Sequence, residues 1–215
     1  MGTVTDRFTD RTTAGRLLGV ELARLPWQEP VVLALPRGGV PVAAGVADAL
    51  AAPLDVVVAR KVGAPSQPEL AVGAVTADGA YLFDHATLTQ LRLTRDDVAD
   101  ELAAATAEAR RRQQRYGSPE RPSRAERDVI IVDDGLATGL TALAAVHAVR
   151  AQEPRSITLA VPVGSSSAVR RLREVADSVH CLLQPAMFQA VGQWYRDFQQ
   201  VTDDEVGALV NAHAR

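Results

Sequence analysis

The stretch that decides the fold runs from Val129 to Thr141 and reads VIIVDDGLATGLT. Its first four residues are apolar and β-branched, which is the pattern of a parallel strand covered by helices on both faces. The pattern breaks at Asp133 and Asp134, and the glycines that follow permit a tight turn before a helix. The stretch therefore predicts a buried strand that ends in two acids and turns into the start of a helix.

The turn after the two acids has the composition of a phosphate-binding loop. Backbone N–H groups in the first turn of a helix lack partners within the helix and attract anions. Thr138 and Thr141 add hydroxyl donors, but no lysine follows Gly139, so the nucleoside-triphosphate P-loop pattern is not met. We expect a phosphate on Ala137, Thr138, Gly139, Leu140 and Thr141. The alternative is an Asp-Asp-Gly turn that simply caps a helix.

The acid pair restricts which phosphate ligand the loop can hold. Two carboxylates repel a phosphate unless hydroxyl donors or a cation lie between them. A ribose 5-phosphate meets this condition, because its 2- and 3-hydroxyls can donate to Asp133 and Asp134 while its phosphate lies on the loop. A divalent cation shared with a pyrophosphate on carbon 1 would relieve the repulsion further. With these features in order, the segment resembles the signature of the type I phosphoribosyltransferases, which use 5-phosphoribosyl 1-pyrophosphate (PRPP).

Length and composition favour one compact domain. The chain has 215 residues, 47% of them hydrophobic, a net charge of −3 and a single cysteine, Cys181. Such a chain can bury a core without disulfides, and its charge gives no overall attraction to nucleic acid. No apolar run reaches the roughly 20 residues of a membrane helix, and the amino terminus lacks the apolar core of a signal peptide. We expect a cytoplasmic protein without nucleic-acid or membrane partners, for which the resemblance allows a homo-oligomer.

Short apolar runs alternate with helical segments along the chain, which implies a parallel sheet with right-handed crossovers. The expected strands are Val31–Leu35, Asp55–Ala59, Val129–Val132, Ile157–Val161 and Val179–Leu183. The expected helices are Asp10–Leu25, Val40–Ala51, Thr94–Tyr116, Leu140–Ala151 and Ser165–Ala176.

We therefore predict an α/β fold with a Rossmann-like open, mainly parallel twisted sheet and helices on both faces. A flexible hairpin and a small C-terminal hood complete it. The whole of 1–215 forms a single domain, with its core at about 28–183, the hairpin at about 62–83 and the hood at about 184–215, to which N-terminal residues can add.

A second loop, PRGG at 36–39, follows the first expected core strand. Open parallel sheets bind ligands at the carboxyl ends of their strands, and paired glycines let a polyanion approach the backbone. The resemblance implies that Arg37, Gly38 and Gly39 hold the pyrophosphate of the donor. The alternative is an ordinary strand-to-helix turn.

Two cations, Arg60 and Lys61, come directly after the expected strand Asp55–Ala59, which places them at the same edge of the sheet. Positive charge there suits a departing pyrophosphate. We favour Lys61 over Arg60 as the contact, and the alternative is a solvated basic pair.

The segment between Lys61 and Tyr81 is rich in glycine and proline and predicts a mobile hairpin, with strands near 70–75 and 80–83. The resemblance implies that this hairpin closes over the donor to exclude water. Glu69 on the hairpin could then act as a base or orient the acceptor. The alternative is an exposed loop carboxylate.

Two features bear on the acceptor. The resemblance places Ala137 where enzymes that act on hypoxanthine and guanine usually carry an acid, which argues against a 6-oxopurine substrate. The tail after the last expected strand holds Phe188, Trp194, Tyr195 and Phe198. The first three are candidates for contact with the acceptor, because base rings stack on aromatic faces. The alternative is a hydrophobic anchor that packs the tail on the sheet edge.

Two charged runs have simpler interpretations. Arg110–Arg112 lies in a helical pattern and is interpreted as a solvated helix end, favoured by the helix dipole. The pair Asp203 and Asp204 is interpreted as the start of the final short helix.

The resemblance implies a magnesium-dependent phosphoribosyltransferase that transfers ribose 5-phosphate from PRPP to a nitrogenous acceptor, with a nucleobase favoured. The catalytic candidates are Asp133, Asp134, Lys61 and Glu69. Mg²⁺ would bind through the donor and through Asp133 and Asp134. The main alternative is a non-catalytic sensor that binds PRPP as an effector. A hydrolase or phosphatase on the same sheet is a weaker one.

Overall fold

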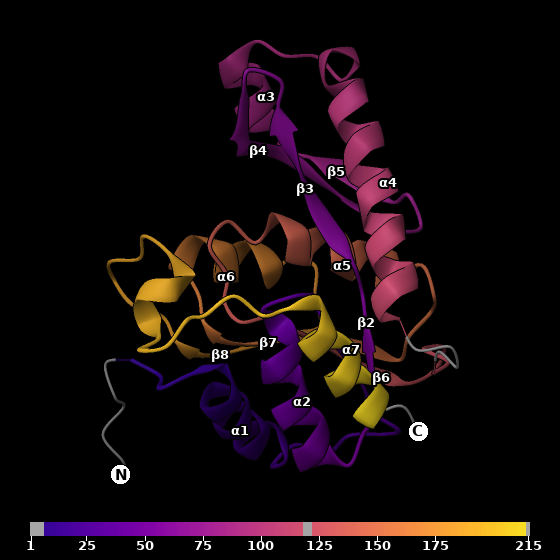
Figure 1. Cartoon of the computed structure of the whole chain (residues 1–215), viewed down its shortest axis with the longest axis vertical. Helices are drawn as coiled ribbons and strands as arrows, with labels where there is room; N and C mark the ends of the chain where they lie inside the picture. The colour runs from indigo at the N-terminus through magenta and orange to yellow at the C-terminus, as the bar shows by residue number, and fades with distance from the viewer. Residues whose placement is uncertain (1–6, 118–121, 214–215) are drawn as a thin grey trace.

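The computed structural model describes residues 7–117 and 122–213. Its centre is a five-stranded sheet with the order β2-β1-β6-β7-β8, in which every neighbouring pair is parallel. Figure 1 shows helices above and below this sheet. The predicted α/β fold with a mainly parallel sheet is confirmed.

The main sheet and its helices have the following bounds. The strands are β1 (Val31–Ala34), β2 (Leu54–Val56), β6 (Asp128–Val132), β7 (Ser156–Val163) and β8 (Ser178–Leu183). The helices are α1 (Arg11–Leu22), α2 (Gly39–Leu50), α5 (Leu140–Arg150), α6 (Ser166–Leu172) and α7 (Asp203–Ala212), with a short 3-10 helix η2 (Val191–Trp194) before α7. Most predicted elements are found within a few residues of their expected bounds.

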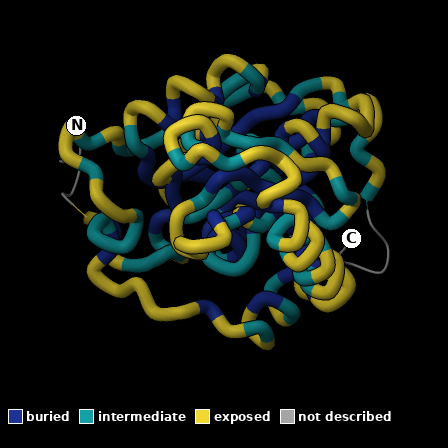
Figure 2. Tube along the Cα trace, turned by 90° about the horizontal axis from the view of Figure 1, so that it is seen from above, coloured by how far each residue is buried: buried dark blue, intermediate teal, exposed yellow. Residues whose placement is uncertain are grey.

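Alternate residues of the strands face opposite layers of helices. Val32 of β1 and Ile130 of β6 pack into the cluster that holds α1, α2 and α7. Val31 and Ile131 pack into the cluster that holds α5 and α6. Both faces of these strands are buried, which explains why their sequence is a continuous apolar run and not an alternating one. In Figure 2 the buried parts of the trace run through the centre and the exposed parts form the rim.

A separate three-stranded antiparallel sheet projects from the main body (Figure 1). It consists of β3 (Ala59–Ala64), β4 (Gln67–Thr76) and β5 (Tyr81–Phe83). It is covered by α3 (His85–Leu91), the 3-10 helix η1 (Asp96–Val98) and α4 (Ala99–Tyr116). We call this unit, residues 59–116, the arm. The predicted hairpin corresponds to β4 and β5, while α3 was not predicted.

The predicted strand Asp55–Ala59 was wrong, because it merges parts of two sheets. β2 pairs with β1 only as far as Val56, opposite Ala34, where β1 ends. Without a neighbour beyond that point, the chain leaves the main sheet and pairs with β4 from Ala59 onward. Gln113 of α4 fixes this crossing, since its amide accepts from Val58 N at 3.1 Å and donates to the Val56 carbonyl at 3.3 Å.

The segment from Leu183 to α7 returns over the carboxyl edge of the sheet and joins the amino-terminal residues. Phe8 forms a bridge with Tyr195, and the Phe8 N–H donates to the Trp194 carbonyl at 2.8 Å. Both residues belong to an apolar cluster that also contains Phe188 and Val163. α7 begins at Asp203 behind a capping box of Thr202 and Glu205, which confirms the interpretation of the Asp203 and Asp204 pair.

Candidate active site

The acid pair follows β6 directly, at the carboxyl edge of the main sheet. The Asp134 N–H donates to Asp133 Oδ1 at 2.8 Å. Burial raises the pKa of both carboxyls, and the adjacent charge of Asp134 raises that of Asp133 further. At Asp134 the guanidinium of Arg11 opposes this rise, since its Nε lies 2.8 Å from Asp134 Oδ2. Two carboxylates of this kind favour hydroxyl donors or a cation as their ligands.

The predicted phosphate loop connects Leu136 to the start of α5. Gly139 has φ of 75°, a left-handed conformation that disfavours a side chain, and it caps the helix that begins at Leu140. Ala137 and Thr138 are exposed at the tip of the loop. The loop is held from beneath, because Ser165 Oγ donates to the Ala137 carbonyl at 2.7 Å. The exposed tip thus lies at the start of α5, where backbone N–H groups attract anions, and the Leu140 N–H lies 3.5 Å from Thr138 Oγ1.

The Pro36–Gly39 loop lies directly against the acid pair. The Pro36–Arg37 peptide bond is cis, and Gly39 begins α2. A Cβ on Gly38 would lie 2.1 Å from Asp134 Oδ2, so the position has room only for glycine. The two segments that the sequence singled out are thus in contact. Arg37 turns the other way, and its Nη1 lies 3.4 Å from Asp203 Oδ1 of α7.

Arg60 and Lys61 lie within β3 of the arm and not at the end of a main-sheet strand, which corrects the expected reason for their position. Lys61 Nζ lies 2.6 Å from Glu69 Oε2 on the neighbouring strand β4. The hydrogen bond from Lys61 holds the pKa of Glu69 below its usual value, and the carboxylate is 97% exposed. A lowered pKa makes Glu69 a weaker base, so this pairing favours a role in orientation over proton transfer.

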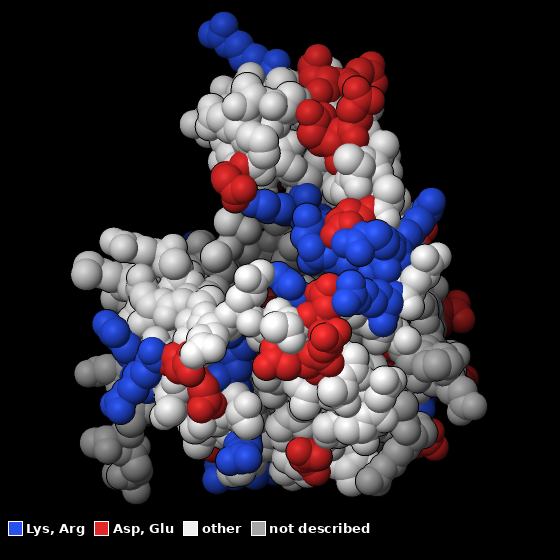
Figure 3. Space-filling model, viewed as in Figure 1, with Lys and Arg blue, Asp and Glu red and all other residues white. Residues whose placement is uncertain are grey.

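A cleft of about 700 Å³ separates the arm from the main body. Its lining includes Pro36, Lys61, Glu69 and most of the phosphate loop: Ala137, Thr138, Leu140 and Thr141. Figure 3 shows the molecule hollowed between the two parts. The structure thus brings the predicted phosphate loop together with the predicted hairpin cation. Asp133, Asp134 and Arg37 are not among the described residues that line this cleft; Arg37 follows Pro36 in the chain, and Asp134 contacts Gly38.

The sequence analysis named Arg60 but favoured Lys61, and both line the cleft. It missed several other polar residues of this cleft, which are Asp84, Thr87, Arg112, Ser167 and Arg171. Arg110 and Arg111 are exposed, as the interpretation of their run as a solvated helix end predicted, but Arg112 is not: its side chain is 22% exposed and pairs with Glu108 at 2.6 Å. The sequence could have indicated this ion pair, because Glu108 and Arg112 are four residues apart on one helix. Figure 3 shows Lys and Arg side chains gathered near the end of α4 where this helix meets the main body.

Arg60 has an unusual environment. Its Nε is buried and lacks a hydrogen-bond partner among the described residues. Burial and then the nearby charge of Arg112 lower the pKa of Arg60. Together with Lys61 these groups give the arm's side of the cleft a positive surface suited to an anion.

The predicted acceptor residues pack on one another at the other end of the carboxyl edge. Tyr195 is 3% exposed and stacks between Phe8 and Phe198, with ring centroids at 5.6 and 5.2 Å. Its hydroxyl donates to the Asp134 carbonyl at 2.6 Å. Phe188 and Trp194 are half-buried against the same cluster. This packing agrees with the alternative of a hydrophobic anchor, and contact with an acceptor stays a prediction.

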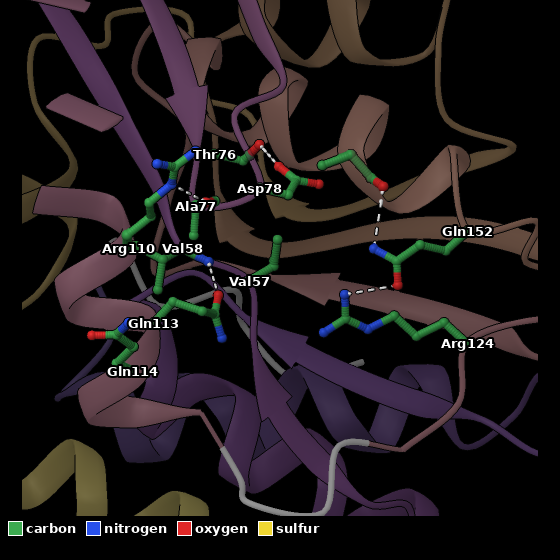
Figure 4. Close-up of a pocket in the computed structure, with 11 residues that line it drawn as sticks. Val57, Val58, Thr76, Ala77, Asp78, Arg110, Gln113, Gln114, Arg124 and Gln152 are labelled. Carbon is green, nitrogen blue, oxygen red and sulfur yellow. Dashed lines mark hydrogen bonds between the residues drawn. The ribbon is translucent and has the colours of Figure 1, made fainter. Parts of the chain in front are cut away.

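A second, smaller cavity of about 290 Å³ lies where α4 and the Val57–Val58 crossing meet the end of α5 (Figure 4). The figure shows its polar side chains already engaged with the protein: Gln113 with Val58, Arg110 with Ala77, and Arg124 with Gln152. The residues that line this cavity come from both the arm and the main body, and the bond between Gln113 and Val58 lies where the chain crosses between the two parts. We therefore assign this cavity to the joint between them and not to the candidate site.

No cluster of three or more His, Cys, Asp or Glu side chains is arranged to hold a metal within residues 7–117 and 122–213. Asp133 and Asp134 fit part of the ligand set of Mg²⁺, which takes carboxylate oxygens together with phosphate oxygens and water. Burial raises the pKa of both carboxyls, and a bound cation would stabilise their ionised forms.

Comparison with known proteins identifies the family. A family model described as the phosphoribosyl transferase domain matches residues 13–199. The chain belongs to the phosphoribosyltransferase family. "Putative phosphoribosyl transferase Rv0571c" of Mycobacterium tuberculosis (strain ATCC 25618 / H37Rv) is 46% identical over 216 residues, which cover 95% of this chain and 46% of that protein. The phosphoribosyltransferase chain thus spans about half the length of the curated relatives that it matches.

Solved structures share the fold of this phosphoribosyltransferase chain. The crystal structure of TT1426 from Thermus thermophilus is 44% identical, has a TM-score of 0.81 and covers 97% of this chain and 100% of its own. The AQ2163 protein of Aquifex aeolicus shares the fold, with 13% identity, a TM-score of 0.51 and coverage of 80% of this chain and 73% of its own. The predicted resemblance to the type I phosphoribosyltransferases is confirmed, and the acceptor-specific branch stays unidentified. In the described part of this chain, no helix has the length and apolar character to cross a bilayer.

Proposed function

We propose that the protein transfers ribose 5-phosphate from PRPP to a nitrogenous acceptor, a nucleobase being the class we favour, with release of pyrophosphate. The observation that carries the proposal is the contact between Gly38 and Asp134. It sets the loop expected to hold pyrophosphate against the acid pair expected to hold the ribose, and the phosphate loop follows the acids within the same turn.

Residues at the carboxyl edge of the main sheet and on the arm would bind each part of PRPP. The ribose 2- and 3-hydroxyls would donate to Asp133 and Asp134. The 5-phosphate would lie on the backbone N–H groups of 137–141, at the open first turn of α5. The pyrophosphate would lie on Arg37–Gly39, and Lys61 would reach it from the cleft, which Pro36 of the same loop lines. Arg37 would have to leave Asp203 for this, and their separation of 3.4 Å marks a weak bond.

The residues also fit the charge changes of the reaction. Cleavage of the bond between carbon 1 and pyrophosphate places positive charge on the ribose and negative charge on the leaving group. Asp133 and Asp134 would stabilise the positive charge on the ribose. Lys61, Arg60 and Arg112 would stabilise the negative charge on the departing pyrophosphate. A bound Mg²⁺ would neutralise part of the pyrophosphate charge. Glu69, on the exposed strand of the arm beside Lys61, would orient the acceptor or help to close the cleft.

The test is calorimetric titration of the protein with PRPP and MgCl₂. We expect binding to the wild type and its loss in an Asp133→Asn, Asp134→Asn variant, because amides neither accept two ribose hydroxyls as strongly nor hold Mg²⁺. Asp100→Asn is the matched control, since Asp100 is exposed in the first turn of α4, in the arm. Absence of binding to the wild type would contradict the proposal.

Binding would then justify a screen of acceptors for pyrophosphate release. Release with one acceptor would identify the substrate. Tight PRPP binding with no release from any acceptor would favour the alternative of a non-catalytic PRPP sensor. Release of phosphate from PRPP without an acceptor would instead favour a phosphatase.

A further inference from the structure

Arg11, the first residue of α1, lies against the acid pair although 122 residues separate it from Asp133 in the sequence. Its Nε donates to Asp134 Oδ2 at 2.8 Å, and its Nη1 donates to the Gln199 carbonyl at 2.7 Å. The two side chains of the ion pair are only 11% and 13% exposed. Because two of its nitrogens donate to different acceptors, the guanidinium of Arg11 is fixed in both position and plane.

The C-terminal segment completes the environment of Arg11. The guanidinium carbon lies 3.7 Å from the centroid of the Phe198 ring and 6.0 Å from that of Tyr195. An aromatic face both attracts the cation and shields it from water, which strengthens its ion pair. Asp10 caps α1 immediately before Arg11, so the start of the helix is set as well.

Asp134 is consequently held from three sides. Arg11 binds its Oδ2, the Tyr195 hydroxyl binds its carbonyl at 2.6 Å, and Gly38 limits its movement toward the Pro36–Gly39 loop. Arg11 occupies Oδ2 of Asp134 and the Asp134 N–H occupies Oδ1 of Asp133, so a ligand would use Oδ1 of Asp134 and Oδ2 of Asp133. These contacts of Asp134 thus determine which of its carboxylate oxygens would face the ribose.

We propose that Arg11 is a positioning residue of the donor site: stacked on Phe198, it orients Asp134 so that the acid pair can accept the ribose hydroxyls of PRPP. This inference rests on the proposed function. It gives the first turn of α1 and the segment 195–199 a part in donor binding, whereas the sequence assigned that tail only to the acceptor or to packing. Arg11 touches the acid and not the reacting atoms.

The test compares Arg11→Met with Arg16→Met, an exposed arginine on the same helix. Two probes are used with MgCl₂ present: PRPP, which has the ribose hydroxyls, and inorganic phosphate, which needs only the phosphate loop. We expect Arg11→Met to bind PRPP at least about tenfold more weakly, with phosphate affinity unchanged and Arg16→Met like the wild type. PRPP affinity equal to that of the wild type, or an equal loss for both probes, would overturn the proposal.

Two further variants separate geometry from charge and guard against misfolding. Arg11→Lys keeps the charge but cannot bridge Asp134 and Gln199 while it stacks, so we expect its PRPP affinity to stay closer to that of Arg11→Met than to the wild type. Full recovery in Arg11→Lys would refute a role for the guanidinium geometry. If Arg11→Met does not fold, Phe198→Leu removes the stacking face of Arg11 and the ring contact with Tyr195 but leaves the Arg11–Asp134 pair, and we expect about threefold weaker PRPP binding with unchanged phosphate binding.

The failure of the proposed function can be told apart from the failure of this inference. If the wild type does not bind PRPP, the proposed function fails. The ion pair between Arg11 and Asp134 is then tested by comparing the melting temperatures of Arg11→Met, Asp134→Asn and the double variant. Coupling predicts that the double variant melts no lower than the less stable single variant, while additive losses would overturn the contact.

Discussion

Gly38→Ala tests the contact on which the candidate site depends. The added Cβ would lie 2.1 Å from Asp134 Oδ2 and 2.7 Å from its Cγ, whereas real Cβ contacts essentially never fall below 3.0 Å. The backbone at Gly38 has φ of −59°, which alanine adopts freely, so the whole effect comes from this clash. The carboxylate must move away, but Arg11 holds its Oδ2, and the Tyr195 hydroxyl holds the backbone carbonyl of the same residue.

The expected cost follows from these contacts. Overpacking of a tight site costs about 1–3 kcal/mol, and disturbance of a nearly buried hydrogen bond between charged groups adds about 1.5–3 kcal/mol. Because the two costs partly replace each other, we expect Gly38→Ala to lower the free energy of unfolding by about 3 kcal/mol. For a chain of this size that corresponds to a melting temperature lower by about 6–12 °C.

The assay is urea unfolding followed by circular dichroism, with Gly207→Ala as the matched control. A Cβ on Gly207 would meet nothing within 4 Å, so this change in the interior of α7 should raise stability by about 0.5–1 kcal/mol. In an Asp134→Ala background, where the clashing carboxylate is gone, Gly38→Ala should cost less than about 1 kcal/mol. An equal cost in both backgrounds, or less than about 1 kcal/mol in the wild type, would refute the contact.

Two further predictions concern pKa values away from the acid pair. Burial raises the pKa of the Cys181 thiol to about 11, so iodoacetamide at mildly alkaline pH should alkylate the folded protein about a hundredfold more slowly than the unfolded one, and similar rates would contradict this. Hydrogen bonds from Arg111 and Arg112 lower the pKa of Glu108 from 4.5 to about 2. Stability from this depressed acid is present above about pH 4.5 and is lost as the pH falls toward about 2, so Glu108→Gln should flatten the decline in urea stability between about pH 5 and pH 3. An unchanged decline in the variant would count against this.

The structure also shows where sequence patterns mislead. The run Val57-Val58-Ala59 is apolar and contains two β-branched valines, so the sequence pattern alone joined it to Asp55 as one strand. Whether the run continues in the main sheet depends on whether β1 still offers a partner, and β1 ends at Ala34. Strand partners are distant in sequence, so the pattern within one strand does not contain that information.

The residues that the sequence missed share one property: they reach the site from elements distant in the chain. Arg112 lines the cleft from α4, and Arg171 does so from α6. In the sequence each is one arginine in an ordinary helix pattern. Arg11 similarly follows a helix cap, and nothing near it indicates Asp134.

The sequence by itself determined the parallel α/β core, the acid pair with its phosphate loop, and the glycine loop at 36–39. These are local features, since apolar runs define buried strands and a glycine turn at a helix start forms an anion site within a few residues. Only the tertiary structure decided that Gly38 touches Asp134, that Arg11 pairs with that acid, that Arg37 turns to Asp203, and that Lys61 faces the phosphate loop from a separate sheet. Such contacts join groups far apart in the chain, so they depend on how the layers pack and not on any local pattern.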